Sequence, residues 1–432
     1  MDDERNNPDG PTAPTGTQEP ESETRQGRRL PPAFESLRNR NFRLLWFGQL
    51  GQASAMWADQ VARSWLTWQL TGSATAVGLV NFFRAIPLIT LGLLGGVIAD
   101  RFDKRTILIV IQTWSLCVYV VMAVLLLGDW IELWHVYFTA LLLGGGMALN
   151  SPVRTSLIPQ LLDGRLLVNA MSLNSIAINV TRLTGPAAIG FMIALAGDDV
   201  APAYVVAVIV YVIIIFTTIQ IDFKSTQASG PRPSFVSDLI EGFRYLALEN
   251  RTAMMLVVLA AGPLAFAHSY VTLLPVFVTT VLDGGSSGFG LIQSVSAVGA
   301  LVGGFTLASL RDVRHKGRIM MITGLSYGVL VLVLGSVTWT FLAFGIVVFI
   351  GASQTVFRTS NNSSLLEITP RRLQGRVLSV TALDMGVQAL AAVLAGAITD
   401  AYSVAVGMAV LGGMCLVIVA IVGIGAPAIR RL

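Results

Sequence analysis

Two long apolar runs in the first third of the chain are joined by only a short charged turn. The runs cover residues 75–99 and 106–127, and residues 100–105 between them carry five charges in six positions. Each run is long enough to cross a hydrocarbon core about 30 Å thick as a helix. Because a bilayer interior cannot satisfy open backbone groups, the pattern predicts a hairpin of two membrane helices with its turn among the lipid headgroups.

Similar apolar runs recur along the whole chain. Only 12% of the 432 residues are charged, about half the share in soluble domains. No soluble part is large enough to fold alone, so the basic residues are expected to meet anionic lipids and not nucleic acid. The sequence predicts twelve membrane-spanning helices, at residues 42–70, 75–99, 106–127, 133–157, 168–196, 201–222, 252–282, 287–310, 319–337, 339–366, 375–400 and 402–424.

The connections between these runs alternate in charge. Every second connection contains Lys or Arg, whereas the intervening ones contain no basic residue. The acidic residues of those intervening connections are Asp129, Glu132, Asp198, Asp199 and Asp283. Basic loops of membrane proteins stay in the cytoplasm. We therefore expect a multi-pass protein of the bacterial inner (plasma) membrane, with both termini cytoplasmic.

One basic connection is much longer than the others and divides the chain into two halves. We expect a disordered cytoplasmic tail at 1–33, a six-helix bundle at 34–222, a cytoplasmic linker at 223–251, a second six-helix bundle at 252–426 and a tail at 427–432. The linker places Phe235, Leu239, Phe243 and Leu246 at helical spacing. This predicts an amphipathic helix on the cytoplasmic surface.

Short motifs recur in both halves. Gly92-Leu-Leu-Gly-Gly returns as Ala300-Leu-Val-Gly-Gly, and Arg154-Thr-Ser returns as Arg358-Thr-Ser. Parallel halves of six helices form a transporter architecture in which the substrate binds near the midplane, between the halves. The repeats therefore predict a central cavity.

The first charged turn resembles a signature of the major facilitator superfamily, G-x-x-x-D-R-x-G-R-K/R. Its matching residues are Gly96, Asp100, Arg101, Lys104 and Arg105, with Asp103 where glycine is usual. The resemblance covers the chain from about residue 34 onward. It implies an all-α membrane protein whose twelve transmembrane helices form two pseudo-symmetric six-helix bundles. The segments Leu70-Thr-Gly-Ser and Glu241-Gly-Phe-Arg-Tyr also resemble the branch that includes the enterobactin exporter and macrolide efflux proteins.

The fifth run contains Gly185, Pro186 and Gly190, which resemble the superfamily's antiporter signature G-P-x-x-x-G. The resemblance implies export in exchange for protons, although Phe191 stands where a further glycine often occurs. The alternative is a kink that serves helix packing alone, because proline bends a helix and glycine allows close helix approach.

Several ionisable residues lie within the predicted spans, where a charge needs a cavity or a partner. The candidates for proton or substrate binding are Asp59, Arg63, Arg84, Arg182, His268 and Asp384. Asp59 and Arg63 are four residues apart and share a helix face. They form either a structural ion pair or a site at which Asp59 takes up and releases a proton.

His268 follows Asp59 by nearly the repeat distance, so the two residues occupy related places in the halves. It either changes charge during the cycle or bonds a backbone carbonyl that Pro263 or Pro275 leaves free. By the resemblance, the helices of Arg84 and Asp384 meet across the two halves. Such a pair would close the outer side or bind an anionic substrate. We expect Arg358 to extend toward the cytoplasmic surface.

The charged turn itself has two interpretations. Asp100 with its basic neighbours would latch the cytoplasmic side to a helix N-terminus of the other half. Alternatively, the basic residues anchor the topology and nothing more.

The sequence contains no ATP-binding loop, metal-ligand spacing or nucleophile motif, so we expect neither an enzyme nor a cofactor or metal site. We predict a monomeric secondary transporter whose partners are a small molecule, protons and lipids. It would export an amphipathic compound, either a drug, as in multidrug resistance, or a siderophore, by proton antiport with alternating access. The alternatives are import or exchange of a metabolite and a lipid-handling role.

Overall fold

The computed structural model describes residues 32–101, 103–222, 235–310 and 315–430. Within these ranges, 32–33, 92–101, 235–239, 427 and 430 are described by their backbone alone. All regular structure in the described part is helical. The predicted tail at 1–33 lies almost wholly outside the described residues.

The first half of the chain forms six long helices after a short turn of helix, η1 (Pro32–Arg38). They are α1 (Arg40–Thr71), α2 (Ala74–Arg101), α3 (Lys104–Leu127), α4 (Leu133–Leu161), α5 (Leu167–Leu195) and α6 (Ala201–Ile219). Short loops join consecutive helices, as the brief breaks between the apolar runs predict.

The second half repeats this arrangement with two of its spans divided. The seventh span comprises α8 (Arg251–Ala260), η4 (Ala261–Phe266), η5 (Ala267–Ser269) and α9 (Tyr270–Thr280). The following spans are α10 (Ser286–Ser309), α11 (Lys316–Leu334), α12 (Thr340–Ile368), α13 (Gln374–Thr381) with α14 (Asp384–Ala401), and α15 (Val404–Gly425). The short α16 (Pro427–Arg430) ends the described chain.

The predicted twelve spans are confirmed. Eleven helices within the described ranges are long and apolar enough to cross a membrane. The twelfth, α1, has 32 residues and ample length, but it is more polar and buries Asp59 and Arg63 inside its bundle. Its charges are therefore sheltered by neighbouring helices and do not face lipid.

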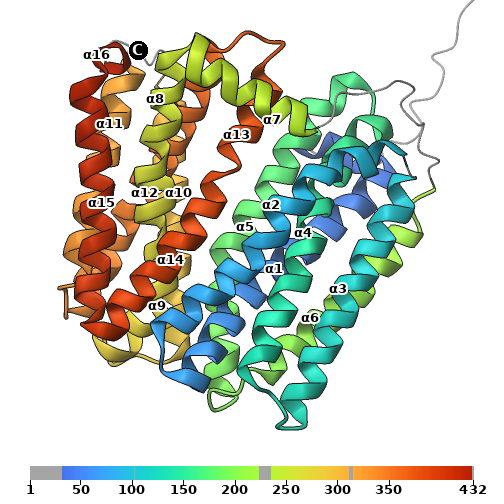
Figure 1. The fold of residues 1–432 in the computed structure, drawn as a ribbon. Helices are drawn as coiled ribbons and strands as arrows, with labels where there is room; N and C mark the ends of the chain where they lie inside the picture. The colour runs from blue at the N-terminus through green and yellow to red at the C-terminus, as the bar shows by residue number, and fades with distance from the viewer. Residues whose placement is uncertain (1–31, 102, 223–234, 311–314, 431–432) are drawn as a thin grey trace, which may run out of the picture.

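The helices gather into two bundles that follow the two halves of the chain. In Figure 1, α1–α6 run from blue to green in one bundle, and α8–α15 run from yellow to red in the other. The bundles meet where α2 packs against α14 and where α5 packs against α10. The second helix of each half thus contacts the fifth helix of the other, as expected for two pseudo-symmetric bundles.

Glycines bring these interface helices into backbone contact. A Cβ atom at Gly78 of α2 would lie 2.7 Å from the carbonyl oxygen of Ala392 in α14. One at Gly190 of α5 would lie 2.9 Å from the Cα atom of Gly290 in α10. Both distances are too short for a side chain, so these positions require glycine for close helix approach.

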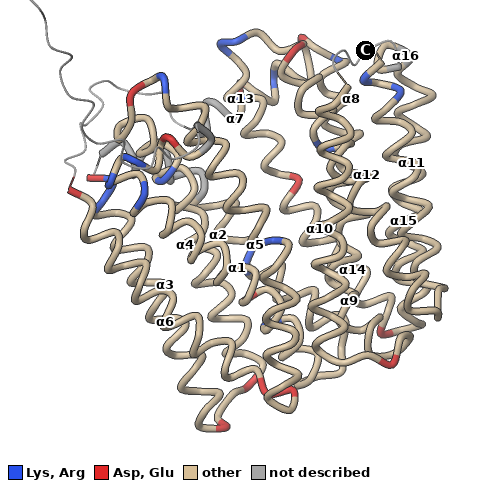
Figure 2. The backbone as a smooth tube through the Cα atoms, turned by 180° about the vertical axis from the view of Figure 1, so that it is seen from behind, with Lys and Arg blue, Asp and Glu red and all other residues tan. Residues whose placement is uncertain are grey.

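The two ends of the bundles differ in charge. We call the end with α7 (Phe235–Arg244) and α16 the linker face, and the other end the opposite face. Basic residues gather at the linker face in Figure 2. The opposite-face loops contain acidic residues and no Lys or Arg, which is the alternation seen in the sequence.

The linker helix α7 continues into a π-helical turn, η3 (Tyr245–Glu249). Of the apolar stripe predicted for it, Leu246 is buried and Phe243 is exposed, whereas the side chains of Phe235 and Leu239 lie outside the described residues. Gly242 makes a close approach, because a Cβ atom there would collide with the carbonyl oxygen of Arg376. The linker helix is therefore held against α13 through a small residue.

Candidate functional site

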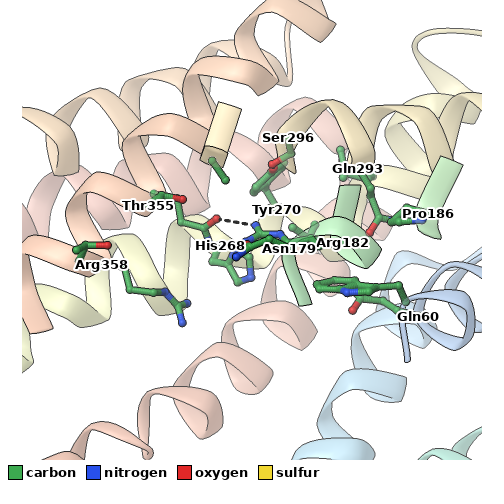
Figure 3. Close-up of a pocket in the computed structure, with 16 residues that line it drawn as sticks. Gln60, Asn179, Arg182, Pro186, His268, Tyr270, Gln293, Ser296, Thr355 and Arg358 are labelled. Atoms are coloured by element: carbon green, nitrogen blue, oxygen red, sulfur yellow. Dashed lines mark hydrogen bonds between the residues drawn. The ribbon is translucent and has the colours of Figure 1, made fainter. Parts of the chain in front are cut away.

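A cavity of about 350 Å³ lies between the two bundles. Figure 3 shows Gln60, Asn179 and Arg182 of the first half around it, with His268, Gln293 and Arg358 of the second. An adjoining cavity of about 220 Å³ shares Gln60, His268 and Gln293 with it and adds Arg84. We call the two together the central cavity, which is where the repeat pattern predicted it.

The seventh span lines this cavity through an irregular stretch. The π-helical η4 contains Pro263, which has no N–H to donate. The 3₁₀ turn η5 follows and contains His268. The eleventh span is also interrupted, between α13 and α14, immediately before Asp384. The sequence predicted two continuous helices here, because each stretch is uniformly long and apolar.

Arg182, Gln354, His268 and Tyr327 form a chain of polar contacts beside the cavity. Arg182 Nη2 donates to Gln354 Oε1 at 3.3 Å, and Gln354 Nε2 lies 2.6 Å from His268 Nδ1. An arginine can only donate, so the amide nitrogen of Gln354 is the group that faces His268, and Nδ1 accepts. The Tyr327 hydroxyl lies 3.3 Å from the same nitrogen. The partners of His268 among the described residues are therefore side chains, whereas the sequence also allowed a backbone carbonyl.

Arg182 and Arg358 are the cationic groups of the larger cavity. Arg182 lies over the ring of Trp57, with 5.9 Å from Cζ to the ring centroid. Among the described residues, neither arginine forms an ion pair with a carboxylate. Arg358 lines the cavity and is exposed. Its expected extension toward the cytoplasmic surface stays a prediction.

Arg154 forms hydrogen bonds within its own bundle. It occupies the place in the first half that Arg358 has in the second. It is buried and donates to the Leu45 carbonyl and to Gln52 Oε1, both at 2.9 Å. These bonds tie α4 to α1. The two repeat-related arginines thus differ, since Arg154 is bonded within its bundle and Arg358 faces the cavity.

Asp59 and Arg63 form the ion pair that their spacing allows. Arg63 Nη2 lies 2.7 Å from Asp59 Oδ1, and the two residues are 3% and 1% exposed. Arg63 Nη1 also donates to the Val136 carbonyl at 3.0 Å and to Thr139 Oγ1 at 2.7 Å. Each of the three guanidinium nitrogens of Arg63 thus donates a hydrogen bond, and the pair links α1 to α4.

Arg84 connects this pair to the cavity. Its Nη1 lies 3.8 Å from Asp59 Oδ2, and its Nη2 donates to Met147 Sδ at 2.9 Å. Arg84 also lines the smaller cavity. The carboxylate that pairs with Arg84 is thus Asp59 of its own half, and the described residues contain no ion pair between Arg84 and Asp384.

The Gly185–Pro186–Gly190 segment lies at the interface with the other half. Pro186 lines the cavity, and Gly185 packs against Trp57. Ala187 N donates to Ser294 Oγ of α10 at 2.9 Å. The segment therefore brings α5 and α10 together. Its role in antiport stays a prediction.

At the opposite face, a carboxylate of the second half holds a helix of the first. Asp400, near the end of α14, accepts from Ser73 Oγ at 2.6 Å, from Ala74 N at 2.7 Å and from Thr75 N at 3.0 Å. These donors surround the N-terminus of α2. A helix N-terminus favours a negative charge through its free N–H groups.

A second contact of the same kind lies at the repeat-related position. Asp198, after α5, accepts a hydrogen bond from Ser286 Oγ at 2.5 Å. Ser286 is the first residue of α10. We call this contact and the one at Asp400 the opposite-face latches. The sequence interpretation missed them, although a Gly-Ser pair occurs at the start of both helices, as Gly72-Ser73 and Gly285-Ser286.

The charged turn at the linker face is described in part. Asp103 caps α3 and accepts from Thr106 N at 2.8 Å. Lys104 Nζ donates to the Ser156 carbonyl at 3.3 Å, and Arg105 donates to the Ile219 carbonyl. The side chains of Asp100 and Arg101, and the surroundings of Gly96, lie outside the described residues. The Asp100 latch therefore stays a prediction.

Comparison with known protein families identifies the family of this chain. A family described as transmembrane secretion effectors, within the major facilitator group, matches residues 32–429. The chain belongs to this family. Such proteins are transporters and not enzymes. This member of the secretion effector family is therefore a multi-pass membrane transporter. The resemblance that the sequence motifs suggested is confirmed.

Two bacterial relatives of this family member are similar over most of their length. It is 27% identical over 364 residues to the staphyloferrin A transporter of Staphylococcus aureus, covering 82% of this chain and 89% of that protein. It is 23% identical over 287 residues to YfmI of Bacillus subtilis, an uncharacterized transporter of the major facilitator type, covering 63% and 68%.

Solved structures resemble the family member in fold. A POT family transporter in complex with 5-aminolevulinic acid has a TM-score of 0.74 at 12% identity, covering 90% of this chain and 97% of that one. A bacterial homologue of the human lysosomal transporter Spinster, inward-facing and unoccupied, has a TM-score of 0.67 at 14% identity, covering 93% and 97%. Both likenesses support the two-bundle fold.

Proposed function

We propose that this transporter exports a small amphipathic compound, a siderophore in preference to a drug, across the bacterial inner membrane in exchange for protons. The observation that carries the proposal is the central cavity, whose polar lining comes from both halves. The family's description as secretion effectors supports export. The name of the Staphylococcus aureus relative supports a siderophore.

The distribution of charged residues supports one orientation of the protein in the membrane. Basic residues gather at the linker face, and the loops of the opposite face are acidic. The positive-inside rule supports a cytoplasmic linker face, with both termini inside. The opposite-face latches then close the external side. In this orientation the cavity loads its solute from the cytoplasm before the halves rearrange.

Proton exchange is assigned to Asp59 through Arg84. Every nitrogen of the Arg63 guanidinium is bonded, so Arg84 is the partner of Asp59 that can leave. Antiport requires the solute and the proton to bind in alternation. While a solute fills the cavity, Arg84 stays beside Asp59 and compensates its charge. After the solute has left, Arg84 can turn into the empty cavity, and a proton then replaces the missing positive charge on the buried carboxylate.

Inverted membrane vesicles test the proposal. Vesicles that carry the full chain should accumulate a labelled siderophore or an amphipathic antibiotic when their interior is acidic. An uncoupler should abolish the accumulation. Vesicles with Asp59→Asn protein at matched expression serve as the control for coupling.

The other outcomes discriminate between the alternatives. Accumulation that persists with the uncoupler would contradict proton antiport. Accumulation of a metabolite in right-side-out vesicles alone would indicate import. Movement of labelled phospholipid without any soluble substrate would indicate the lipid-handling role.

A further inference from the structure

We propose that the central cavity binds an anion, whose carboxylate or phosphate oxygens are held by Arg182 and Arg358 together. The inference rests on the proposed function, because it names the chemical class of the solute that occupies the same cavity. Neither the family nor the relatives specify that class for this chain. The argument depends on charge, on free hydrogen-bond donors and on the placement of the two arginines.

The described lining of the central cavity contains positive charge and no carboxylate. Its basic side chains are Arg84, Arg182, Arg358 and His268, and Tyr270 is its other ionisable residue. Arg84 lies beside Asp59, whereas Arg182 and Arg358 carry like charges into the same cavity. Arg182 is partly buried, and Arg358 is exposed. Neither arginine has a carboxylate partner among the described residues. An anion in the cavity would supply that counter-charge.

The uncharged groups around these arginines also favour an acceptor-rich solute. Gln293 Nε2 and Trp57 Nε1 are buried in the cavity lining, and neither has a hydrogen-bond partner among the described residues. Both atoms can only donate. A buried donor without a partner carries a free-energy penalty that a ligand's oxygen removes. The positive charge of the lining disfavours amines, which would add like charge.

The two arginines come from opposite halves. Arg182 lies on α5 and Arg358 on α12. A guanidinium presents a planar fork that matches carboxylate or phosphate oxygens with two parallel hydrogen bonds. An anion held by both forks would join the bundles across the cavity and replace the repulsion between Arg182 and Arg358 with attraction. The bound solute would thereby favour closure around itself.

Binding to the purified full chain tests this inference with three probes. They are citrate as a carboxylate, inorganic phosphate, and tetraphenylphosphonium as an amphipathic cation. Tryptophan fluorescence and thermal unfolding report binding, since a ligand of the folded state raises Tm. We expect saturable binding of citrate or of phosphate, and the stronger of the two identifies the oxyanion. Arg182→Gln and Arg358→Gln should each weaken that binding about tenfold or more.

Matched variants separate loss of binding from loss of folding. Arg371→Gln removes an exposed arginine of the linker face and should bind like the original chain. Arg182→Lys and Arg358→Lys keep the charge without the fork, and should give intermediate affinity with an unchanged size-exclusion profile. The inference is overturned if neither anion binds, if tetraphenylphosphonium binds more tightly than both, or if the Gln variants bind anions as the original chain does.

Vesicle export distinguishes this inference from the proposed function. Anion binding that depends on Arg182 and Arg358, without export of any compound, would refute the export proposal and leave the binding inference standing. Export of a cationic or neutral compound at an unchanged rate by the Arg182→Gln variant would refute the inference and leave export standing.

Discussion

Asp400 holds Thr75 across the interface between the two halves, accepting from its backbone N at 3.0 Å and from its hydroxyl at 2.6 Å. The two residues are 325 positions apart in the sequence. Their contact fixes the start of α2 to the end of α14. Together with the Asp198–Ser286 contact, it makes the closure of the opposite face nearly symmetric.

The first prediction concerns these latches. Asp400→Asn removes the negative charge from the N-terminus of α2 and should destabilise the closed opposite face. For an exposed carboxylate we expect about 1 kcal/mol, which shifts the equilibrium between closed and open forms roughly fivefold. Spin labels at positions 129 and 283, one on each half, measure this opening in a protein whose Cys117 and Cys415 are replaced by serine. The distance between the labels should be longer in the Asp400→Asn variant than in the original protein.

A neighbouring carboxylate provides the control for this experiment. Asp199 accepts from Ala201 N at 2.8 Å within its own half. Asp199→Asn should therefore leave the label distances unchanged. Asp198→Asn should act like Asp400→Asn, and the double variant should open the face further. Equal distances in the original protein and in all four variants would refute a latching role.

The second prediction concerns Gly190. A Cβ atom there would lie 2.5 Å from the Ser286 carbonyl oxygen. Gly190→Ala should therefore push α5 away from α10, and we expect transport to fall about tenfold because the closed state is disfavoured. Gly413→Ala is the control, because nothing lies within 4 Å of its added Cβ. A Gly190→Ala protein with normal transport and unchanged label distances would contradict this packing role.

The third prediction separates Arg63 from Arg84. Arg63→Gln would leave Asp59 buried without its main partner, which should reduce the free energy of unfolding by about 3–5 kcal/mol. Arg84→Gln should reduce it much less, because Arg84 lies farther from the carboxylate and beside a cavity. Thermal unfolding in detergent compares the two. Equal losses of stability would show that Arg84 is as structural as Arg63.

The fourth prediction concerns Asp59 itself. Asp59→Asn keeps the shape of the side chain but cannot take up a proton, so it should abolish uphill export. Solute binding in the cavity should persist, because Asp59 does not line it. Parallel measurements of vesicle accumulation and of solute binding test both statements. Normal accumulation would leave Asp59 a purely structural partner of Arg63.

Some of this structure could be predicted from sequence because the bilayer imposes local rules. Twelve apolar runs give twelve spans, since a helix is the way for one segment to satisfy its backbone in lipid. The four-residue spacing of Asp59 and Arg63 likewise predicts their contact, because it is set within one helix.

Contacts between distant helices could not be read in the same way. Nothing in the spacing indicates that Arg84 meets Asp59, because that contact depends on how α1 and α2 pack. Asp198 looked like an ordinary acidic loop residue, and its bond to Ser286 requires the two halves to be assembled. The interruption before Asp384 also has no proline to signal it.

The different contacts of Arg154 and Arg358 suggest how a protein with two repeated halves can change its substrate. Arg154 is bonded to α1 inside the first bundle, so its replacement would destabilise the fold. Among the described residues, Arg358 forms no ion pair or hydrogen bond, so its replacement would alter the cavity more than the fold. New cargo preferences would then arise through substitutions in the second half, while the first half preserves the framework that they rely on.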